Sequence, residues 1–236
     1  MTTKRNQHLK LVTRNGRALA HIKDQTKEMC IAAVKQYGLA LEYVINQTEE
    51  ICLEAVKNDY RALQYAKQQS HEMCIEVIKH NCWALKYVDQ TYEICLEAVR
   101  LHRAAISFIR DPTEELCIAA VRSDGEALRH IKDQTKEICL EAVRQTGCVL
   151  ESVTNQTEEI CLEAVRQNGY ALNYVKKQTE EICVTAIVNP SFSCFGHVLD
   201  IDNPRRLEYV RDPGVREICR KIQEGKRFLT TKSAKK

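Results

Sequence analysis

The sequence predicts an all-α solenoid of about eight helical hairpins, each about 22 residues long, with a cap at either end. Two observations predict this fold. Eight cysteines recur at steps of 22 residues, with a single step of 21, and a similar motif surrounds each of them. Because each unit of such an array buries its apolar face only against its neighbours, no central core is needed. The repeated cysteines are Cys30, Cys52, Cys74, Cys95, Cys117, Cys139, Cys161 and Cys183.

The longer helix of each unit is predicted by its start, its apolar face and its end. In the unit around Cys161, Thr157 is a good N-cap, and two glutamates follow where the helix dipole favours negative charge. The apolar residues within 160–165 cover about half of the helix circumference. Gly169 then supplies the left-handed residue that commonly ends a helix.

A second, shorter helix is predicted after Gly169, with Ala171, Leu172 and Val175 on its core face. Neither helix is long enough to be stable alone in water, so stacking on neighbouring units must stabilise both. Three units lack the glycine, and we expect their preceding helices to be less well terminated. These units begin at Tyr60, Cys82 and Arg103.

The repeat pattern also predicts where the array begins and ends. His8 takes the cysteine place in a partial first copy, and Asn189-Pro190 breaks the pattern. Cys219 follows Cys183 by 36 residues, so 14 residues are inserted. Apolar side chains in the insert are expected to cover the end of the stack; they are Phe192, Phe195, Val198, Leu199 and Ile201. The predicted segments are an N-terminal end with a capping half-repeat (1–15), eight hairpins (16–189), a divergent C-terminal cap (190–223) and a basic, mostly disordered tail (224–236).

Charge is divided unevenly along the chain. The formal net charge is +3, with +5 in residues 1–17 and +6 in residues 220–236, which leaves −8 for the body. Phosphate binding needs a positive contact face, so nucleic acid is not expected to run along the whole array. Contact with nucleic acid at the basic ends stays open.

Location is predicted from what the sequence lacks and from its cysteines. We expect no membrane span, because there is no run of 18 apolar residues, and no secretion, because the first residues lack an apolar signal segment. Twelve cysteines then favour a reducing, cytoplasmic location.

The cysteine column itself has a structural interpretation. Neighbouring parallel helices lie about 8–10 Å apart, whereas a disulfide needs Cα atoms within about 7 Å. Thiolates on one zinc ion would have to be about 4 Å apart. We therefore expect the repeated cysteines to be small buried residues that let helices approach closely, and we expect no metal and no cofactor.

The recurring pattern QTEEICLEAV[KR]QNGxALxYV resembles the uncharacterised short helical repeats of proteins from giant viruses of amoebae. The resemblance covers about residues 6–188. It implies an α-solenoid and a viral source, hence the host cytoplasm as location. It brings no catalytic residue and no ligand.

The shorter helices carry the candidate binding residues. Their second and sixth positions share a face, and one position varies widely while the other is usually aromatic. Two interpretations stay open: a modular recognition surface, or aromatic rings that wedge between neighbouring helices beside solvated variable residues. Trp83 with Tyr87 is the best anchor, because Trp, Tyr and Arg dominate interface hot spots. The full predicted set is Trp83, Tyr87, Arg61, Tyr65, Tyr170 and Tyr174.

Two polar columns have both structural and functional interpretations. A cation in the last turn of each longer helix could track a polyanion, but it also suits the helix dipole and a glutamate three residues earlier. A glutamine before each longer helix could hold a bound peptide, but we favour hydrogen bonds to neighbouring loops. The cations are Lys35, Lys57, Lys79, Arg100, Arg122, Arg144 and Arg166, and the glutamines are Gln25, Gln47, Gln69, Gln90, Gln134, Gln156 and Gln178.

No catalytic motif is present, and the histidines are scattered over several repeat positions. The sequence therefore predicts a monomeric, non-enzymatic scaffold for protein–protein interaction, with a basic or mixed-charge partner segment. The first alternative is a nucleic-acid-binding repeat protein that uses the basic ends and the aromatic strip. The second is a structural component that assembles end to end.

Overall fold

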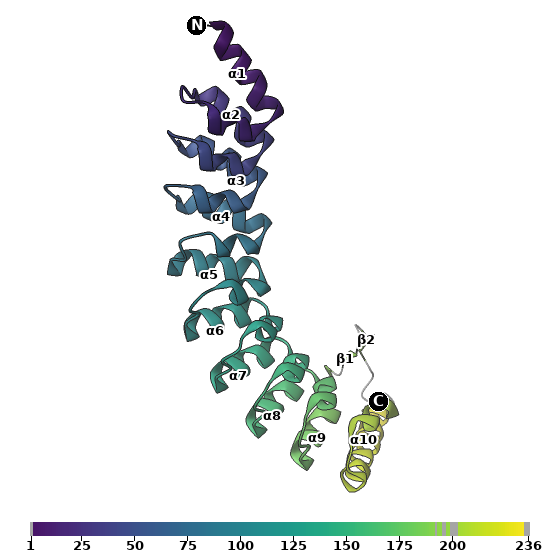
Figure 1. The fold of residues 1–236 in the computed structure, drawn as a ribbon. Helices are drawn as coiled ribbons and strands as arrows, with labels where there is room; N and C mark the ends of the chain where they lie inside the picture. Colours follow the sequence, from purple (N-terminus) through teal and green to yellow (C-terminus); the bar gives the residue numbers. More distant parts are fainter. Residues whose placement is uncertain (1, 192, 195–196, 199–202, 234–236) are drawn as a thin grey trace. The chain divides into compact units, whose positions relative to one another are not determined.

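The computed structural model describes residues 2–191, 193–194, 197–198 and 203–233, and the side chains of 4–191, 203 and 205–224. The chain divides into two compact units, Met1–Asp111 and Pro112–Lys236. Each unit is a stack in which short 3₁₀ helices alternate with α-helices (Figure 1). This arrangement confirms the predicted all-α fold of tandem helical repeats.

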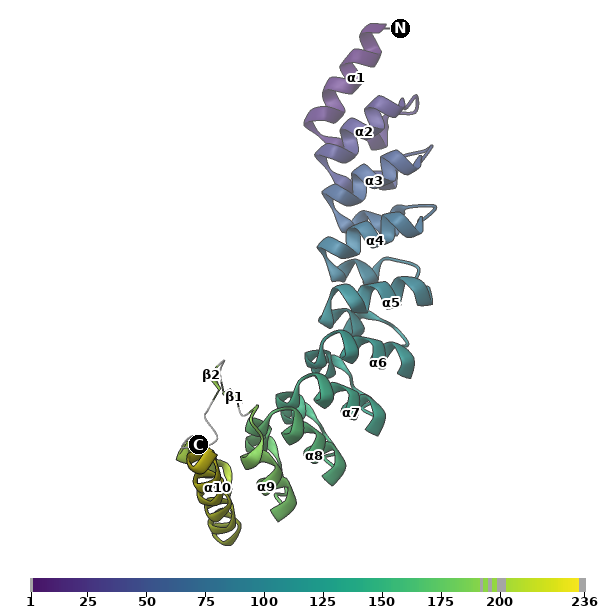
Figure 2. The same ribbon diagram turned by 180° about the vertical axis from the view of Figure 1, so that it is seen from behind.

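In the first unit, α1 (Thr2–Arg14) is followed by four pairs of a 3₁₀ helix and an α-helix and by a last 3₁₀ helix. The helices α2, α3 and α4 follow one another as successive layers, and the view from behind shows the same order (Figure 2). The 3₁₀ helices are η1 (Gly16–His21), η2 (Gly38–Tyr43), η3 (Tyr60–Tyr65), η4 (Cys82–Lys86) and η5 (Arg103–Phe108). The α-helices are α2 (Lys27–Gln36), α3 (Glu49–Asn58), α4 (His71–His80) and α5 (Tyr92–Leu101).

The second unit continues the alternation and ends in a different way. Its repeats are α6 (Glu114–Ser123), η6 (Gly125–His130), α7 (Lys136–Gln145), η7 (Gly147–Ser152), α8 (Glu158–Gln167), η8 (Gly169–Tyr174) and α9 (Glu180–Val188). After α9 come two short antiparallel strands, β1 (Ser193–Cys194) and β2 (His197–Val198), with Ser193 opposite Val198. The chain then forms η9 (Pro204–Tyr209) and α10 (Pro213–Ser233).

The starts of the α-helices agree with the predicted caps. The Thr157 hydroxyl accepts a hydrogen bond from the backbone N–H of Ile160 at 3.3 Å, and Glu158 opens the helix. The same bond is made in the other repeats by Thr26, Thr48, Ser70, Thr91, Thr113, Thr135 and Thr179.

The second helix of each hairpin is a 3₁₀ helix, which the sequence analysis did not specify. In η8 the N–H of Val175 donates to the carbonyl of Leu172 at 3.3 Å, a three-residue closure. A six-residue segment is too short to gain much from α-helical bonding, so the tighter turn is enough. The preceding α-helix ends at an extended residue, as at Asn168 (φ −149°).

The prediction that the repeated glycine ends the longer helix in a left-handed conformation is wrong. Gly169 is the first residue of η8, and the extended residue before it is the helix C-cap. Units that lack the glycine end their longer helix in the same way: Asp59 donates its N–H to Ala55 at 2.9 Å, as Tyr37 does to Ala33. Termination therefore does not depend on glycine.

The glutamine column ties successive 3₁₀ helices together. The Gln156 side-chain amide donates to the carbonyls of Leu150 and Tyr174, each at 3.0 Å, and accepts from the N–H of Lys176 at 2.9 Å. The Cys161 thiol donates to the same side-chain oxygen at 3.8 Å. The bonds from the glutamine side chain to the backbone of the following repeat confirm the favoured structural interpretation. They recur at Gln25, Gln47, Gln69, Gln90, Gln134 and Gln178.

The repeated cysteines lie in the core, as predicted. They are buried in every repeat, together with the two apolar residues that follow three and four positions later in the same helix. Burial raises the pKa of each thiol, to about 11 for Cys74 and Cys183. These thiols are therefore neutral core groups at physiological pH.

The C-terminal part restores the repeat after the insertion. Gln178 donates to the carbonyl of Tyr209 at 2.9 Å, so η9 and α10 stand where a further repeat would. Arg206 is fully buried and donates to the carbonyls of Ile187 and Asn189, which lie at the end of α9.

Two predictions fall on this part of the chain. Residues 224–233 belong to α10, so the prediction that they are disordered is wrong; ion pairs of Arg220 with Glu217 and Glu224 carry the helix across that boundary. Within the described residues, no helix combines the length and the apolar character needed to cross a membrane. The side chains predicted to cover the stack, Phe192, Phe195, Val198, Leu199 and Ile201, lie outside the described ones.

Candidate functional site

One step of the first stack is open. The helices α3 and α4 approach each other much less closely than α2 and α3, and the same holds for η3 and η4 against η2 and η3. Position 38 shows why. A Cβ atom on Gly38 would lie 2.6 Å from the carbonyl oxygen of Ala55 in the next helix, so close packing there requires glycine. Tyr60 occupies the equivalent position before α4, and the helix that follows cannot come as near.

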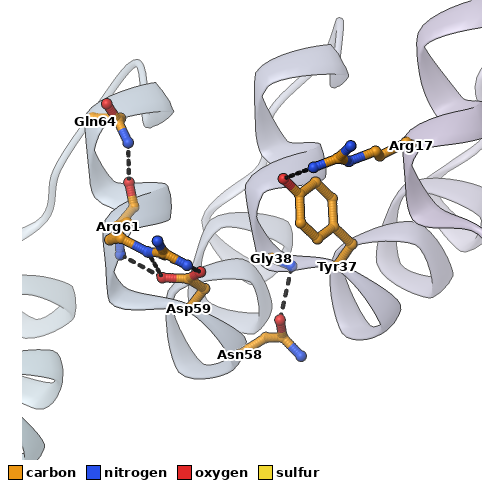
Figure 3. Close-up of polar contacts among 7 residues, drawn as sticks. All are labelled: Arg17, Tyr37, Gly38, Asn58, Asp59, Arg61 and Gln64. Atoms are coloured by element: carbon orange, nitrogen blue, oxygen red, sulfur yellow. Dashed lines mark hydrogen bonds and ion pairs between the residues drawn. The ribbon is translucent and has the colours of Figure 1, made fainter.

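A hydrogen bond that closes the neighbouring step is also missing here. Asn58, the last residue of α3, accepts from the N–H of Gly38 at 2.7 Å and donates to the carbonyl of Lys35 at 2.9 Å (Figure 3). The equivalent residue in α4 is His80. Within the described chain, its side chain is 80% exposed and contacts Glu76 of its own helix at 3.6 Å. On the other edge, the Gln69 clasp still ties η3 to η4.

Three hollows follow the open step, and we call them together the α3–α4 groove. The hollow at the C-terminal ends of the helices measures about 660 Å³, the next about 610 Å³ and the one at the N-terminal ends about 320 Å³. The first two share Lys57 and Glu76, and the last two share Glu49. Apolar side chains line each hollow between charged ones: Val56, Val77, Leu53, Ile75, Cys52 and Met73.

The predicted aromatic anchor belongs to η4 and its C-cap, in the repeat that follows the open step. Trp83 is 50% exposed, its ring lies 5.0 Å from that of Phe108, and the Lys86 ammonium lies 4.4 Å from its centroid. Tyr87 is half-buried and contacts the ring of Tyr60 at 6.0 Å. The two predicted anchors therefore contact different neighbours: Trp83 the following repeat and Tyr87 the preceding one.

The next predicted pair is Arg61 and Tyr65. Arg61 is bound by a carboxylate, and Tyr65 takes part in a hydrogen bond through its backbone carbonyl. Asp59 caps η3 and binds the Arg61 guanidinium at 2.6 Å, as Figure 3 shows. Hydrogen bonds from the Arg61 side chain lower the pKa of the Asp59 carboxyl. Arg61 lines the groove, whereas Tyr65 is half-buried and its carbonyl accepts from Gln47. A second basic side chain of this strip, Arg17, binds the Tyr37 hydroxyl at 3.0 Å.

The remaining predicted residues belong to the second unit. Tyr170 and Tyr174 pack edge to face with ring centroids 6.0 Å apart, and Tyr170 also meets Tyr209 of η9 at 5.2 Å. The rings of Tyr170 and Tyr209 thus pack between repeats, and that of Tyr174 packs against Tyr170 within η8. Arg61 lies before the open step in η3, Trp83 and Tyr87 lie after it in η4 and at its C-cap, and Tyr170 and Tyr174 form a separate cluster.

Five members of the basic column, Lys35, Lys79, Arg122, Arg144 and Arg166, form ion pairs with glutamates. Arg144 binds Glu141 of its own helix at 2.7 Å and Glu163 of the next at 3.6 Å. Arg166 binds Glu163 at 2.8 Å, and Lys79 binds Glu76 at 3.6 Å. This agrees with the dipole and pairing interpretation rather than with a track for a polyanion. Among the described residues, no group of three or more potential metal ligands gathers.

Sequence reasoning missed Tyr60 and His80 as determinants of a site. The absence of glycine at position 60 was visible as a signal, but it was interpreted as a poorer helix end. The groove forms because a side chain at position 60 keeps the next helix from packing closely. A single copy of the motif does not reveal this contact between repeats.

These stacked pairs of helices place the chain in the class of helical-repeat proteins. Four overlapping matches to the family model described as "Domain of unknown function (DUF4116)" cover residues 26–70, 48–92, 113–157 and 136–180. They span more than half of the chain, so the protein belongs to this family. Neither the curated proteins nor the solved structures gave a match.

Proposed function

We propose that this protein is a non-enzymatic scaffold that binds a segment of a partner protein in the α3–α4 groove and against Trp83 and Tyr87 of the repeat that follows the open step. One observation carries the proposal: a single widened step, with an apolar lining between charged edges, in a stack whose neighbouring steps are closed. Concave sites with an apolar lining and a few polar groups are typical of ligand recognition. Half-exposed Trp83 adds a side chain of the kind that dominates interface hot spots.

The charged groups support binding rather than a reaction. Glutamates and cations recur in columns that pair with one another, as Glu141 does with Arg122 and Arg144. These paired groups have structural partners, and the proposal assigns no reaction and no cofactor to the site.

The nucleic-acid alternative rests on the basic ends. There, Arg17 is engaged by Tyr37, and Arg220 pairs with Glu217 and Glu224, which favours a protein partner. Binding of nucleic acid would show a steep loss of affinity with added salt. The viral source and the host cytoplasm, which the repeat resemblance implies, belong to the same proposal and are tested by immunostaining of infected amoebae.

A closed-step variant tests the proposed function. Tyr60→Gly with His80→Asn copies Gly38 and Asn58 into the open step and should let α4 approach α3. The matched control is Cys82→Gly, which changes the equivalent position of the next step. Both proteins and the original chain are immobilised and exposed to nuclease-treated lysate of the source cells.

The original chain and the Cys82→Gly control should retain the same partner, and the closed-step variant should lose it. Equal capture by all three proteins would place the binding site elsewhere. A parallel capture from untreated lysate completes the test: material that binds there but not from the nuclease-treated lysate would favour nucleic acid instead.

A further inference from the structure

One closed step in each stack is bridged by a lysine at the start of an α-helix. Lys27, the first residue of α2, forms an ion pair with Glu50 of α3. Lys136, the first residue of α7, forms the same pair with Glu159 of α8. The cation thus neutralises a glutamate that stands in the first turn of the following helix.

The open step lacks this cation. The residue equivalent to Lys27 is Glu49, and the residue equivalent to Glu50 is Glu72, so two like charges replace an ion pair. Both side chains are exposed and line the 610 Å³ hollow. Within the described residues, neither of them has a cation within ion-pairing distance. A second bridge is also lost, because Glu76 binds Lys79 and His80 of its own helix, whereas the equivalent Glu54 binds Lys35 across the step at 3.3 Å.

Two glutamates at the same repeat position in the second unit do have side-chain partners. Glu114 and Glu158 occupy the same repeat position as Glu49, but they accept hydrogen bonds from the hydroxyls of Thr135 and Thr179 at 2.6 and 3.1 Å. The helices that carry them also pack closely against the next helix. An open step and an acidic pair without a cation therefore coincide between α3 and α4.

The lining between the two glutamates is apolar. Leu53 is half-buried and Ile75 is buried, and both face the same hollow as Glu49 and Glu72. Glu97 of α5 adds a further negative charge at its edge. Lys57 and Lys79 also line the hollow, so it offers an apolar contact among four glutamates and two lysines, and its charge excess is negative.

We propose that the α3–α4 groove binds a basic peptide segment of a partner protein, which places a Lys or Arg side chain between Glu49 and Glu72 and an aliphatic side chain against Leu53 and Ile75. The incoming cation takes the place that Lys27 holds in the closed step before it. Complementary charge of this kind selects partners and fixes the register of the bound segment. The inference rests on the proposed scaffold function and names the chemistry of its partner.

The test uses matched triplets of fluorescent peptides, each about 12 residues long so that a helical peptide spans α3. Within a triplet the apolar residues are constant, and two central positions are both Lys, both Gln or both Glu. Binding to the full chain is followed by fluorescence anisotropy. At least one Lys peptide should bind, its Gln counterpart should bind roughly 3- to 30-fold more weakly, and its Glu counterpart weaker still.

Two variants place the charge effect in the groove. Glu49→Lys installs the residue found in closed steps and should weaken binding of the Lys peptide by about tenfold while the protein stays folded. Glu158→Lys, at the same repeat position of the second unit, should leave this binding unchanged. Circular dichroism and thermal unfolding of both variants check the fold.

The outcomes separate this inference from the proposed function. Peptide binding that the closed-step variant abolishes, but that does not depend on peptide charge or on Glu49, would overturn the inference and leave the scaffold function standing. Absence of binding by every peptide would overturn the inference. So would a concentration-dependent dimer that Glu49→Lys disrupts, or an oligonucleotide that binds more tightly to Glu49→Lys, because the occupant would then be a second copy or nucleic acid.

Discussion

Replacing Gly147 by alanine tests the physical cause of the spacing between repeats. A Cβ atom at this position would lie 2.4 Å from the carbonyl oxygen of Ala164 and 2.9 Å from the side-chain oxygen of Gln167. The same glutamine accepts a hydrogen bond from the Gly147 N–H at 2.7 Å, so displacement of α8 would also weaken that bond. Overpacking costs about 1–3 kcal/mol, and loss of the hydrogen bond about 0.5–1.5 kcal/mol.

An unstrained Gly→Ala substitution would act in the opposite direction. It stabilises a protein by about 0.4–1 kcal/mol, because alanine has less conformational freedom in the unfolded chain. The net expectation for Gly147→Ala is therefore a loss of about 1–3 kcal/mol. Gly214 near the start of α10 supplies the control, because its Cβ would meet only a side-chain oxygen of Asp212, at 3.2 Å, and no backbone atom. Gly214→Ala should leave stability unchanged or raise it slightly.

The assay is urea unfolding of both variants and the original protein, followed by far-ultraviolet circular dichroism. The midpoint of Gly147→Ala should fall and that of Gly214→Ala should not. If Gly147→Ala were as stable as the original protein, close approach would not be the reason for glycine, and the explanation of the open step by Tyr60 would fail with it.

Two further predictions concern the polar and thiol columns. Gln156→Met leaves the carbonyls of Leu150 and Tyr174 and the N–H of Lys176 without their partner. The free energy of unfolding in the same urea assay should therefore fall by about 2–4 kcal/mol. The control Gln145→Met, at an exposed position, should change it little. Burial raises the pKa of the column thiols above their unfolded value of 9.0, to about 11 at Cys74 and Cys183. The stabilising contribution of the neutral thiols is therefore complete below pH 9, and the melting temperature should fall as the pH rises toward 11. A Cys74→Ala, Cys183→Ala variant should show a smaller fall of the melting temperature over this pH range, and an unchanged fall would refute this origin.

The repeat and its main contacts could be predicted from the sequence because each signal is local. The cap at Thr157 is set by residues within one turn of it, and the same local pattern recurs in every unit. The role of Gln156 followed from its place in a loop between two helices, where backbone groups need partners.

The open step could not be predicted in the same way, because it depends on pairs of residues in different repeats. Tyr60 matters through the carbonyl of the following helix, and Glu49 matters through Glu72. The 3₁₀ form of the shorter helices and the continuation of α10 past Glu224 were also outside the repeat pattern. Trp83, Tyr87, Arg61, Tyr65, Tyr170 and Tyr174 stay predictions as binding residues.

Hydrogen–deuterium exchange of the full chain, with and without a bound Lys peptide or captured partner, would locate the binding site among the repeats. Exchange slows where a bound segment covers and rigidifies the backbone, and each repeat yields its own peptides. Our account predicts added protection concentrated in α3 (Glu49–Asn58) and α4 (His71–His80), with α7 and α8 unchanged. Protection confined to the second unit, or spread equally over all repeats, would contradict it.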